Sequence, residues 1–284
     1  MPPALSKLSP RHARVNRPRS NCGEICGGEI YPRIHIYLCP LLSLAKDLST
    51  LAFSIYLARD YLLLIFFDDG RFQRQWENSG CYGGTRGLGL YTAEAYVIGG
   101  AKTVVITSRK EKACEEAKKY LEKVATEVGK DTTIIAIPAD LANENECEAF
   151  FKKVSEQVSA VNILVANAGA TWGAPLEDHP VSAVKKILDL NVVAVFHTIK
   201  LFAPLLEEAG TPKDPLRILI MSSVASLVAS DPVGVYGYLA SKSGVSHMGK
   251  NLALQLGPRN ITVNSIAPGF FPTKNVTGRL RYGR

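Results

Sequence analysis

The stretch Gly83-Gly84-Thr85-Arg86-Gly87-Leu88-Gly89 decides the fold, because three of its glycines have the spacing of a tight strand-to-helix turn. Glycine permits the backbone conformations of such a turn and lets the chain approach a pyrophosphate closely. A helix that begins there offers backbone N–H groups and the positive end of its dipole to the anion. A purely structural loop would explain the glycines about equally well, so the function depends on the rest of the chain.

Downstream of this turn, apolar strand-like runs alternate with amphipathic helical segments. Helices are predicted over 83–99, 109–128, 143–158, 181–208 and 235–256, and strands over 102–107, 132–138, 161–166, 216–221 and 261–266. This alternation predicts an α/β fold, a Rossmann-type doubly wound parallel sheet with helices on both faces. Ligands of such sheets bind beyond the carboxyl ends of the strands, which is where the polar motifs of this chain lie.

The last predicted helix carries Tyr238-Leu239-Ala240-Ser241-Lys242. Residues four apart share one face of a helix, so the phenol and the ammonium are expected side by side. A neighbouring ammonium favours the phenolate and lowers the tyrosine pKa, which suits a residue that exchanges a proton with a substrate oxygen. Taken alone, such a pair is far more often part of a solvated helix surface, so it gains weight only beside the other motifs.

Together these motifs resemble the short-chain dehydrogenase/reductase family over about Gly83–Thr273. The matching motifs follow the family's order: the glycine turn, Asp140, Asn167-Ala168-Gly169, Asn191, Ser223, Tyr238 with Lys242, and Pro268-Gly269. The run from Asn167 to Glu177 resembles one branch, the 3-oxoacyl-(acyl-carrier-protein) reductases of the rhamnolipid-synthesis type and their fungal relatives.

The resemblance implies four catalytic residues. Tyr238 would protonate the carbonyl oxygen of the substrate, and Ser223 would bind and polarise the same oxygen. Lys242 would lower the tyrosine pKa and bind the nicotinamide ribose. Asn191 would hold a water molecule in a proton relay.

The resemblance also implies a nicotinamide cofactor bound by the turn and by the ends of the strands. The implied residues are Gly83, Thr85, Arg86, Gly87, Leu88, Gly89, Ser108, Arg109, Asp140, Leu141, Asn167, Ala168, Gly169, Pro268, Gly269 and Thr273, together with Tyr238 and Lys242. Enzymes that use NAD place an acidic residue after the second strand, where this chain has Ser108 and Arg109. Two guanidiniums, Arg86 and Arg109, favour a 2′-phosphate, so we expect NADPH.

Composition excludes several other classes of function. The net charge is +7, and four of these charges come from residues 1–75, which hold ten Lys and Arg against six Asp and Glu. The sequence contains no dense basic patch with interleaved aromatic residues, so we do not expect binding to nucleic acid. The six cysteines form no CxxC pair and have no histidine at zinc-ligand spacing, so we expect no metal and a reduced, cytoplasmic setting. Arg59 and Asp60 interrupt the apolar stretch Leu51–Phe67, so no membrane span is expected. The expected partners are a small-molecule carbonyl substrate and, from the resemblance, further copies of the chain.

Two departures from the family pattern concern the ends of the domain. A central parallel strand should be a near-continuous apolar run, but Trp76-Glu77-Asn78-Ser79-Gly80-Cys81-Tyr82 precedes the glycine turn. Reading the codons of this stretch one nucleotide later permits Gly-Lys-Thr-Val-Val-Val-Thr-Gly, so we expect residues 1–75 to be an unassigned segment translated out of frame. The family continues past the point that corresponds to Arg284, so we expect a domain over 76–284 that lacks C-terminal elements.

Two functions remain open at this point. One is an oxidoreductase that transfers a hydride from NADPH to a ketone, such as a 3-oxoacyl thioester. The other is a catalytically impaired remnant, or a binding protein, without a complete cofactor site.

Overall fold

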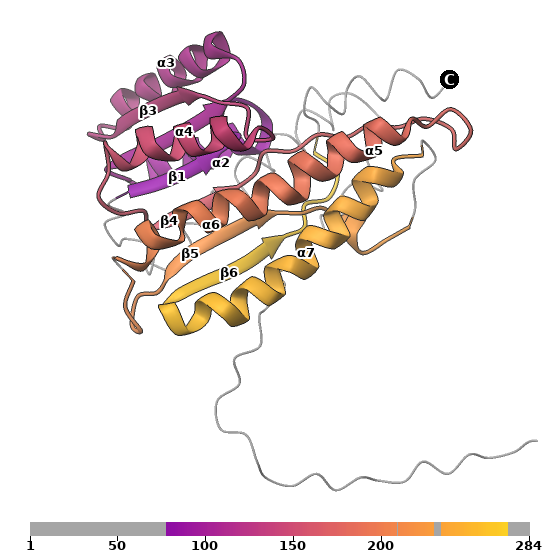
Figure 1. Ribbon diagram of the computed structural model, residues 1–284. Coiled ribbons are helices and arrows are strands. Elements are labelled where there is room, and N and C mark those ends of the chain that lie inside the picture. The colour runs from indigo at the N-terminus through magenta and orange to yellow at the C-terminus, as the bar shows by residue number, and fades with distance from the viewer. Residues whose placement is uncertain (1–77, 209, 230–233, 272–284) are drawn as a thin grey trace, which may run out of the picture. The chain divides into compact units, whose positions relative to one another are not determined.

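The computed structural model describes residues 78–208, 210–229 and 234–271, so the expectation for residues 1–75 lies outside the described part and stays a prediction. Six strands of the described part form one sheet in the order β3-β2-β1-β4-β5-β6 (Figure 1). They are β1 (Asn78–Tyr82), β2 (Thr103–Ser108), β3 (Thr133–Pro138), β4 (Ile163–Ala166), β5 (Leu216–Met221) and β6 (Ile261–Ile266). All neighbouring pairs are parallel, which confirms the predicted doubly wound sheet.

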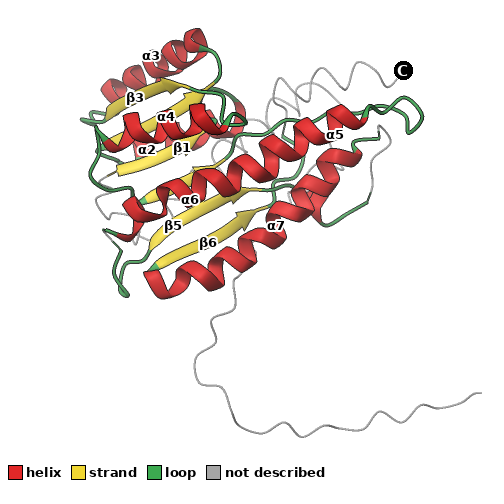
Figure 2. Cartoon of the chain, in the orientation of Figure 1, coloured by secondary structure: helices red, strands yellow, loops and turns green. Residues whose placement is uncertain are grey.

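Helices cover both faces of this sheet and alternate with the strands along the chain (Figure 2). They are α2 (Gly87–Ile98), α3 (Glu111–Glu127), α4 (Glu144–Ser155), α5 (Val181–Leu188), α6 (Ala194–Glu207) and α7 (Tyr236–Leu256), with short turns η2 (Asp189–Val193), η3 (Val224–Ser226) and η4 (Gly257–Arg259). Side chains of α2 and α3 form one apolar core with the sheet. Those of α4, α6 and α7 form the other core, on the opposite face.

The sequences of the strands explain their places in the sheet. All four residues of β4, Ile-Leu-Val-Ala, are buried, as expected of a parallel strand covered on both faces. In β5 and β6 buried residues alternate with half-buried ones, and Arg217 and Asn264 occupy half-buried positions. One face of these two strands therefore packs under α6 and α7, while the half-buried face carries both polar side chains and apolar ones such as Leu219.

Strand β1 occupies the centre of the sheet although its sequence is Asn-Ser-Gly-Cys-Tyr. It pairs with β2 from Asn78↔Thr103 to Tyr82↔Thr107, and with β4 from Ser79↔Ile163 to Tyr82↔Ala166. Strand formation depends strongly on neighbouring strands, and here both edges of β1 are paired. A strand thus occupies the centre of the sheet in spite of its unfavourable composition.

The helix predicted over 181–208 is helical without a break from Val181 to Glu207, but its hydrogen bonding changes part-way along. A π-helical turn, η2, separates α5 from α6 and contains Asn191. Such turns insert an extra residue into a helix and are frequent at functional sites. Within the described residues, Val181–Glu207 is also the one helical stretch long and apolar enough to cross a membrane. Its α6 side chains belong to the apolar core, which accounts for that composition.

Candidate active site

The glycine turn between β1 and α2 has a geometry that depends on its glycines. Gly83 and Gly87 have φ angles of 83° and 55°, in the left-handed region that favours glycine. A Cβ atom on Gly83 would lie 2.8 Å from the backbone nitrogen of Ala168, and one on Gly89 would collide with the carbonyl oxygen of Gly83. The turn therefore forms a close-packed cradle that side chains would fill.

The N-terminus of α2 opens on this cradle. Arg86, the residue before the helix, is extended and its side chain does not cap the helix, and the first turn contains no acidic residue. Thr85 and Leu88 are half-buried, whereas Arg86 is exposed. A helix start with this polarity attracts an anion such as a phosphate group.

Asn167 joins the glycine turn to the end of β4. Its Nδ2 donates a hydrogen bond of 2.9 Å to the carbonyl oxygen of Gly83, and Ala168 follows directly against the same turn. The structure thus brings these two predicted cofactor residues to the turn, and Asn167 acts there by holding the turn in shape.

The ends of β2 and β3 carry the predicted adenosine-binding residues. Ser108 is half-buried, and Arg109 has a side chain that is 69% exposed. One Arg109 nitrogen lies 3.9 Å from a carboxylate oxygen of Asp140, whose other oxygen accepts a hydrogen bond from the backbone N–H of Ala142. The Arg109 guanidinium therefore lies near the carboxyl ends of β2 and β3 but remains free to turn towards another anion.

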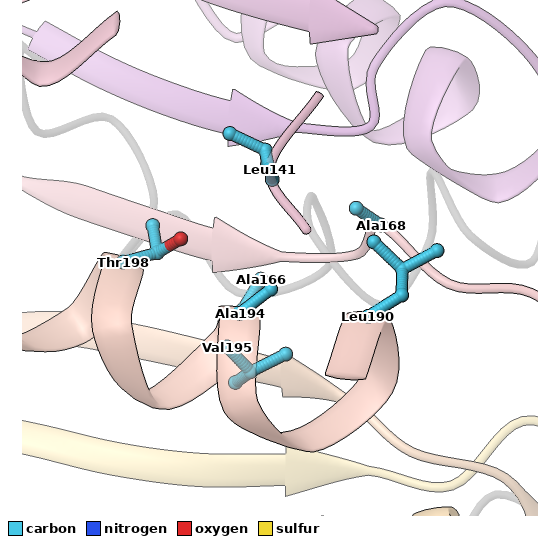
Figure 3. A pocket seen from close by; sticks show the side chains of 7 residues that line it. All are labelled: Leu141, Ala166, Ala168, Leu190, Ala194, Val195 and Thr198. Carbon is cyan, nitrogen blue, oxygen red and sulfur yellow. The ribbon is translucent and has the colours of Figure 1, made fainter. Parts of the chain in front are cut away.

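An apolar pocket lies behind this edge, between the ends of β3 and β4 and the helical segment η2–α6 (Figure 3). It is lined by Leu141, Ala166, Ala168, Leu190, Ala194, Val195 and Thr198. Leu141 and Ala168 were predicted as cofactor residues, whereas the other five, which include the buried polar Thr198, were not.

The first turns of α7 bring Tyr238 and Lys242 together as the spacing predicted. The Lys242 Nζ lies 5.7 Å from the centroid of the Tyr238 ring, and it donates a hydrogen bond of 2.6 Å to the carbonyl oxygen of Met221 at the end of β5. Lys242 is only 6% exposed. Burial lowers its pKa from 10.5 to about 8, while the bond to Met221 favours the ammonium and acts in the opposite direction.

Ser223 follows β5 and caps the short turn η3. Its Oγ accepts a hydrogen bond of 3.2 Å from the N–H of Ala225, and within the described residues it donates none. The hydroxyls of Ser222 and Ser226 instead donate to the backbone carbonyls of Lys242 and Ser223. Of these three serines, Ser223 is therefore the one that keeps its hydroxyl proton for another acceptor, as its predicted role requires.

The loop after β6 completes this edge of the sheet. The carbonyl of Pro268 accepts a hydrogen bond of 3.0 Å from the N–H of Val224, next to Ser223. A Cβ atom on Gly269 would meet no atom of the described residues within 4 Å. Thr273 lies outside the described residues, so its cofactor contact stays a prediction.

Asn191 is 1% exposed, and both the oxygen and the nitrogen of its side-chain amide form hydrogen bonds. Its Oδ1 accepts from the N–H of Ala170 and its Nδ2 donates to the carbonyl of Ala170, each over 2.9 Å. Nδ2 also donates to the Ser241 hydroxyl, again over 2.9 Å. Because both amide protons are used, a relay water, which remains a prediction, would need the second lone pair of Oδ1 or the backbone. Ser241 itself was missed, since the sequence offers no signal for this contact.

Comparison with known proteins places this arrangement in a family. The model of the short chain dehydrogenases matches residues 81–281. The chain belongs to the short-chain dehydrogenase/reductase family. It is therefore an oxidoreductase by family, and the resemblance predicted from its motifs is confirmed.

Individual relatives of this oxidoreductase include bacterial and fungal proteins. The chain is 36% identical to a rhamnolipid-biosynthesis 3-oxoacyl-(acyl-carrier-protein) reductase from Pseudomonas aeruginosa, over 68% of this chain and 72% of the relative. It is 30% identical to the short-chain dehydrogenase/reductase PhomF′ of Diaporthe leptostromiformis, over 70% and 71% of the two chains. The solved RhlG/NADP active-site complex from Pseudomonas aeruginosa superposes with a TM-score of 0.68 at 32% identity, covering 75% of this chain and 79% of that one.

Proposed function

We propose that the chain reduces a ketone with NADPH, and that the substrate is a 3-oxoacyl thioester. The observation that carries the proposal is the buried Lys242 beside Tyr238. This pair lies at the carboxyl ends of the strands, as does the glycine cradle at the N-terminus of α2. The similarity to a 3-oxoacyl-(acyl-carrier-protein) reductase supports the thioester as the substrate class.

The described residues fit a dinucleotide. The close approach of Gly83 to Ala168, and of Gly89 to Gly83, leaves backbone rather than side chains at the start of α2, which suits a pyrophosphate. Asp140 and Leu141 would hold the adenosine end, and Pro268 and Gly269 the nicotinamide end. When bound, the nicotinamide supplies the hydride.

The proton chemistry falls to residues of the chain itself. Ser223 would donate a hydrogen bond to the carbonyl oxygen of the substrate, and Tyr238 would give that oxygen its proton. Lys242 would hold a positive charge near the phenol and favour the phenolate that remains after transfer. Its burial matters because an interaction between charges is stronger where water is excluded.

The preference for NADPH over NADH rests on Arg109 and on the absence of an acidic residue beside it at 108–110. The exposed Arg109 guanidinium can leave Asp140, which lies 3.9 Å away, for a 2′-phosphate. Arg109→Glu should lower the ratio of NADPH to NADH affinity about ten-fold or more, because a carboxylate repels the phosphate and binds a ribose hydroxyl. Lys112→Glu, at an exposed position on the next helix, is the charge-matched control.

The experiment measures both nucleotides by fluorescence titration of the 284-residue chain and then turnover of an acetoacetyl thioester. Tighter binding of NADPH with turnover supports the proposal. Equal or tighter binding of NADH would contradict the cofactor assignment. Binding of NADPH without turnover of any ketone would favour the alternative, a binding protein, for which the polar sequence of the central strand β1 is the motivating observation.

The proposed setting is that of a cytoplasmic homo-oligomer acting on a small carbonyl compound. The support is the family, whose similar members include a bacterial biosynthetic reductase. Size-exclusion chromatography with light scattering tests the oligomeric state.

A further inference from the structure

We propose that Ser241 is a positioning residue that couples the Tyr238 turn of α7 to Asn191 and to the segment after β4; this inference rests on the proposed function for its catalytic meaning. Ser241 is completely buried. Its Oγ donates a hydrogen bond of 2.7 Å to the backbone carbonyl of Tyr238 and accepts one of 2.9 Å from Asn191 Nδ2.

The hydrogen bonds form a chain without spare donors. A side-chain amide has two N–H donors, and those of Asn191 go to the Ala170 carbonyl and to Ser241. The single hydroxyl proton of Ser241 goes to Tyr238. Ser241 is thus the link through which the orientation of the Asn191 amide is tied to the backbone of the predicted proton donor.

A local role does not account for this arrangement. A helical serine commonly bonds the carbonyl three or four residues before it, and such a bond alone would concern only α7. Here the second bond comes from η2, 50 positions away in the sequence. Loss of this bond would leave a buried N–H of Asn191 without an acceptor, which is costly.

The same network lies against the Lys242 amine. A Cβ on Gly169 would be 3.2 Å from Asn191 Oδ1 and 3.6 Å from Lys242 Nζ. Gly169 and Ala170 are consecutive, and Ala170 is held by Asn191 through both its N–H and its carbonyl. A shift of the Asn191 amide would therefore move the chain segment that packs on Lys242.

Ser241→Ala removes the acceptor of one Asn191 proton. The amide then has one tether fewer, so the Ala170 N–H should exchange with solvent deuterium about ten-fold faster or more. Displacement of Tyr238 should lower kcat by up to about 10²-fold, because catalysis depends steeply on position, while KM and the NADPH dissociation constant change little. Ser241→Cys keeps the volume but offers a weaker acceptor, and serves if the alanine variant does not fold.

The test uses the full chain and compares Ser241→Ala, Asn191→Ala and the double variant. Ser243→Ala is the control, since Ser243 is an exposed serine on the same helix that bonds the Ser226 carbonyl at 3.3 Å. Of the two serine variants, we expect only Ser241→Ala to show faster exchange of the Ala170 N–H. We also expect the double variant to lose no more kcat than Asn191→Ala does.

Unchanged exchange at Ala170, or losses in kcat that add in the double variant, would overturn the proposal. If the parent chain turned over no thioester, the proposed function would fail instead. The exchange measurement at Ala170 would then still decide whether Ser241 holds Asn191.

Discussion

Replacing Lys242 by methionine should make the stability of the protein less dependent on pH. The ammonium is buried, with 6% of the residue exposed, and its pKa falls from 10.5 in the unfolded chain to about 8 in the fold. Between these two values the unfolded chain binds more protons than the folded one, so the free energy of unfolding of the parent rises with pH there. Below the lower value the penalty for burying the charge is fully present.

The size of the effect follows from the shift. A change from 10.5 to about 8 corresponds to about 3 kcal/mol at about 1.4 kcal/mol per pH unit. The bond from Lys242 to the Met221 carbonyl stabilises the ammonium and reduces this figure, so we expect the parent to gain about 1–3 kcal/mol relative to Lys242→Met across this pH range. The same variant should lose turnover, since it lacks the charge beside Tyr238.

Urea unfolding of parent and variant between about pH 7 and about pH 10 measures this difference directly. Lys250→Met is the control, because Lys250 lies on the same helix but is exposed. Other groups that titrate in this range contribute equally to the free energy of unfolding of parent and variant, so their contributions cancel in the difference. Curves for Lys242→Met and parent that stay parallel throughout would refute the assignment of a buried, pKa-shifted amine.

Two further substitutions test the cradle and the proton donor. Tyr238→Phe should bind NADPH within about two-fold of the parent but turn over about 10²–10⁴ times more slowly; turnover within a few-fold of the parent would show that another group is the acid. Gly89→Ala places a methyl group against the Gly83 carbonyl, so it should weaken NADPH binding more than about ten-fold and cost about 1–3 kcal/mol of stability. Gly257→Ala, where a Cβ meets nothing within 4 Å, is its control, and equal effects of the two alanines would count against the cradle.

Most of the architecture could be predicted because its causes are local. The apolar runs at 216–221 and 261–266 coincide with β5 and β6, and the order of the motifs along the chain is that of the family. Helix boundaries differed by a few residues, as for the helix predicted from 83, which begins at Gly87. There the glycines form the turn itself, and the left-handed conformation of Gly83 cannot begin a helix.

The remaining features arise from contacts between distant residues. The π-turn η2 contains an ordinary apolar-rich sequence, Asp-Leu-Asn-Val-Val. It brings Asn191 to Ala170, 21 positions before it, and to Ser241, 50 positions after it. Strand β1 likewise forms between two apolar neighbours rather than from its own preference for extended structure. Neither pairing leaves a periodic signal in the sequence.

The bond from Asn167 to Gly83 also has a consequence for biosynthesis. Its two ends are 84 residues apart, so at about 5–20 residues per second a ribosome needs about 4 to 17 seconds to make the second after the first. During that interval β1 can pair with β2, but the strand that covers its other edge, β4, has not emerged. An uncovered strand edge is a template for pairing with other chains. The nascent chain is therefore exposed to aggregation along the edge of β1 that leads into the glycine turn, and a chaperone that shields this edge would act before the cradle exists.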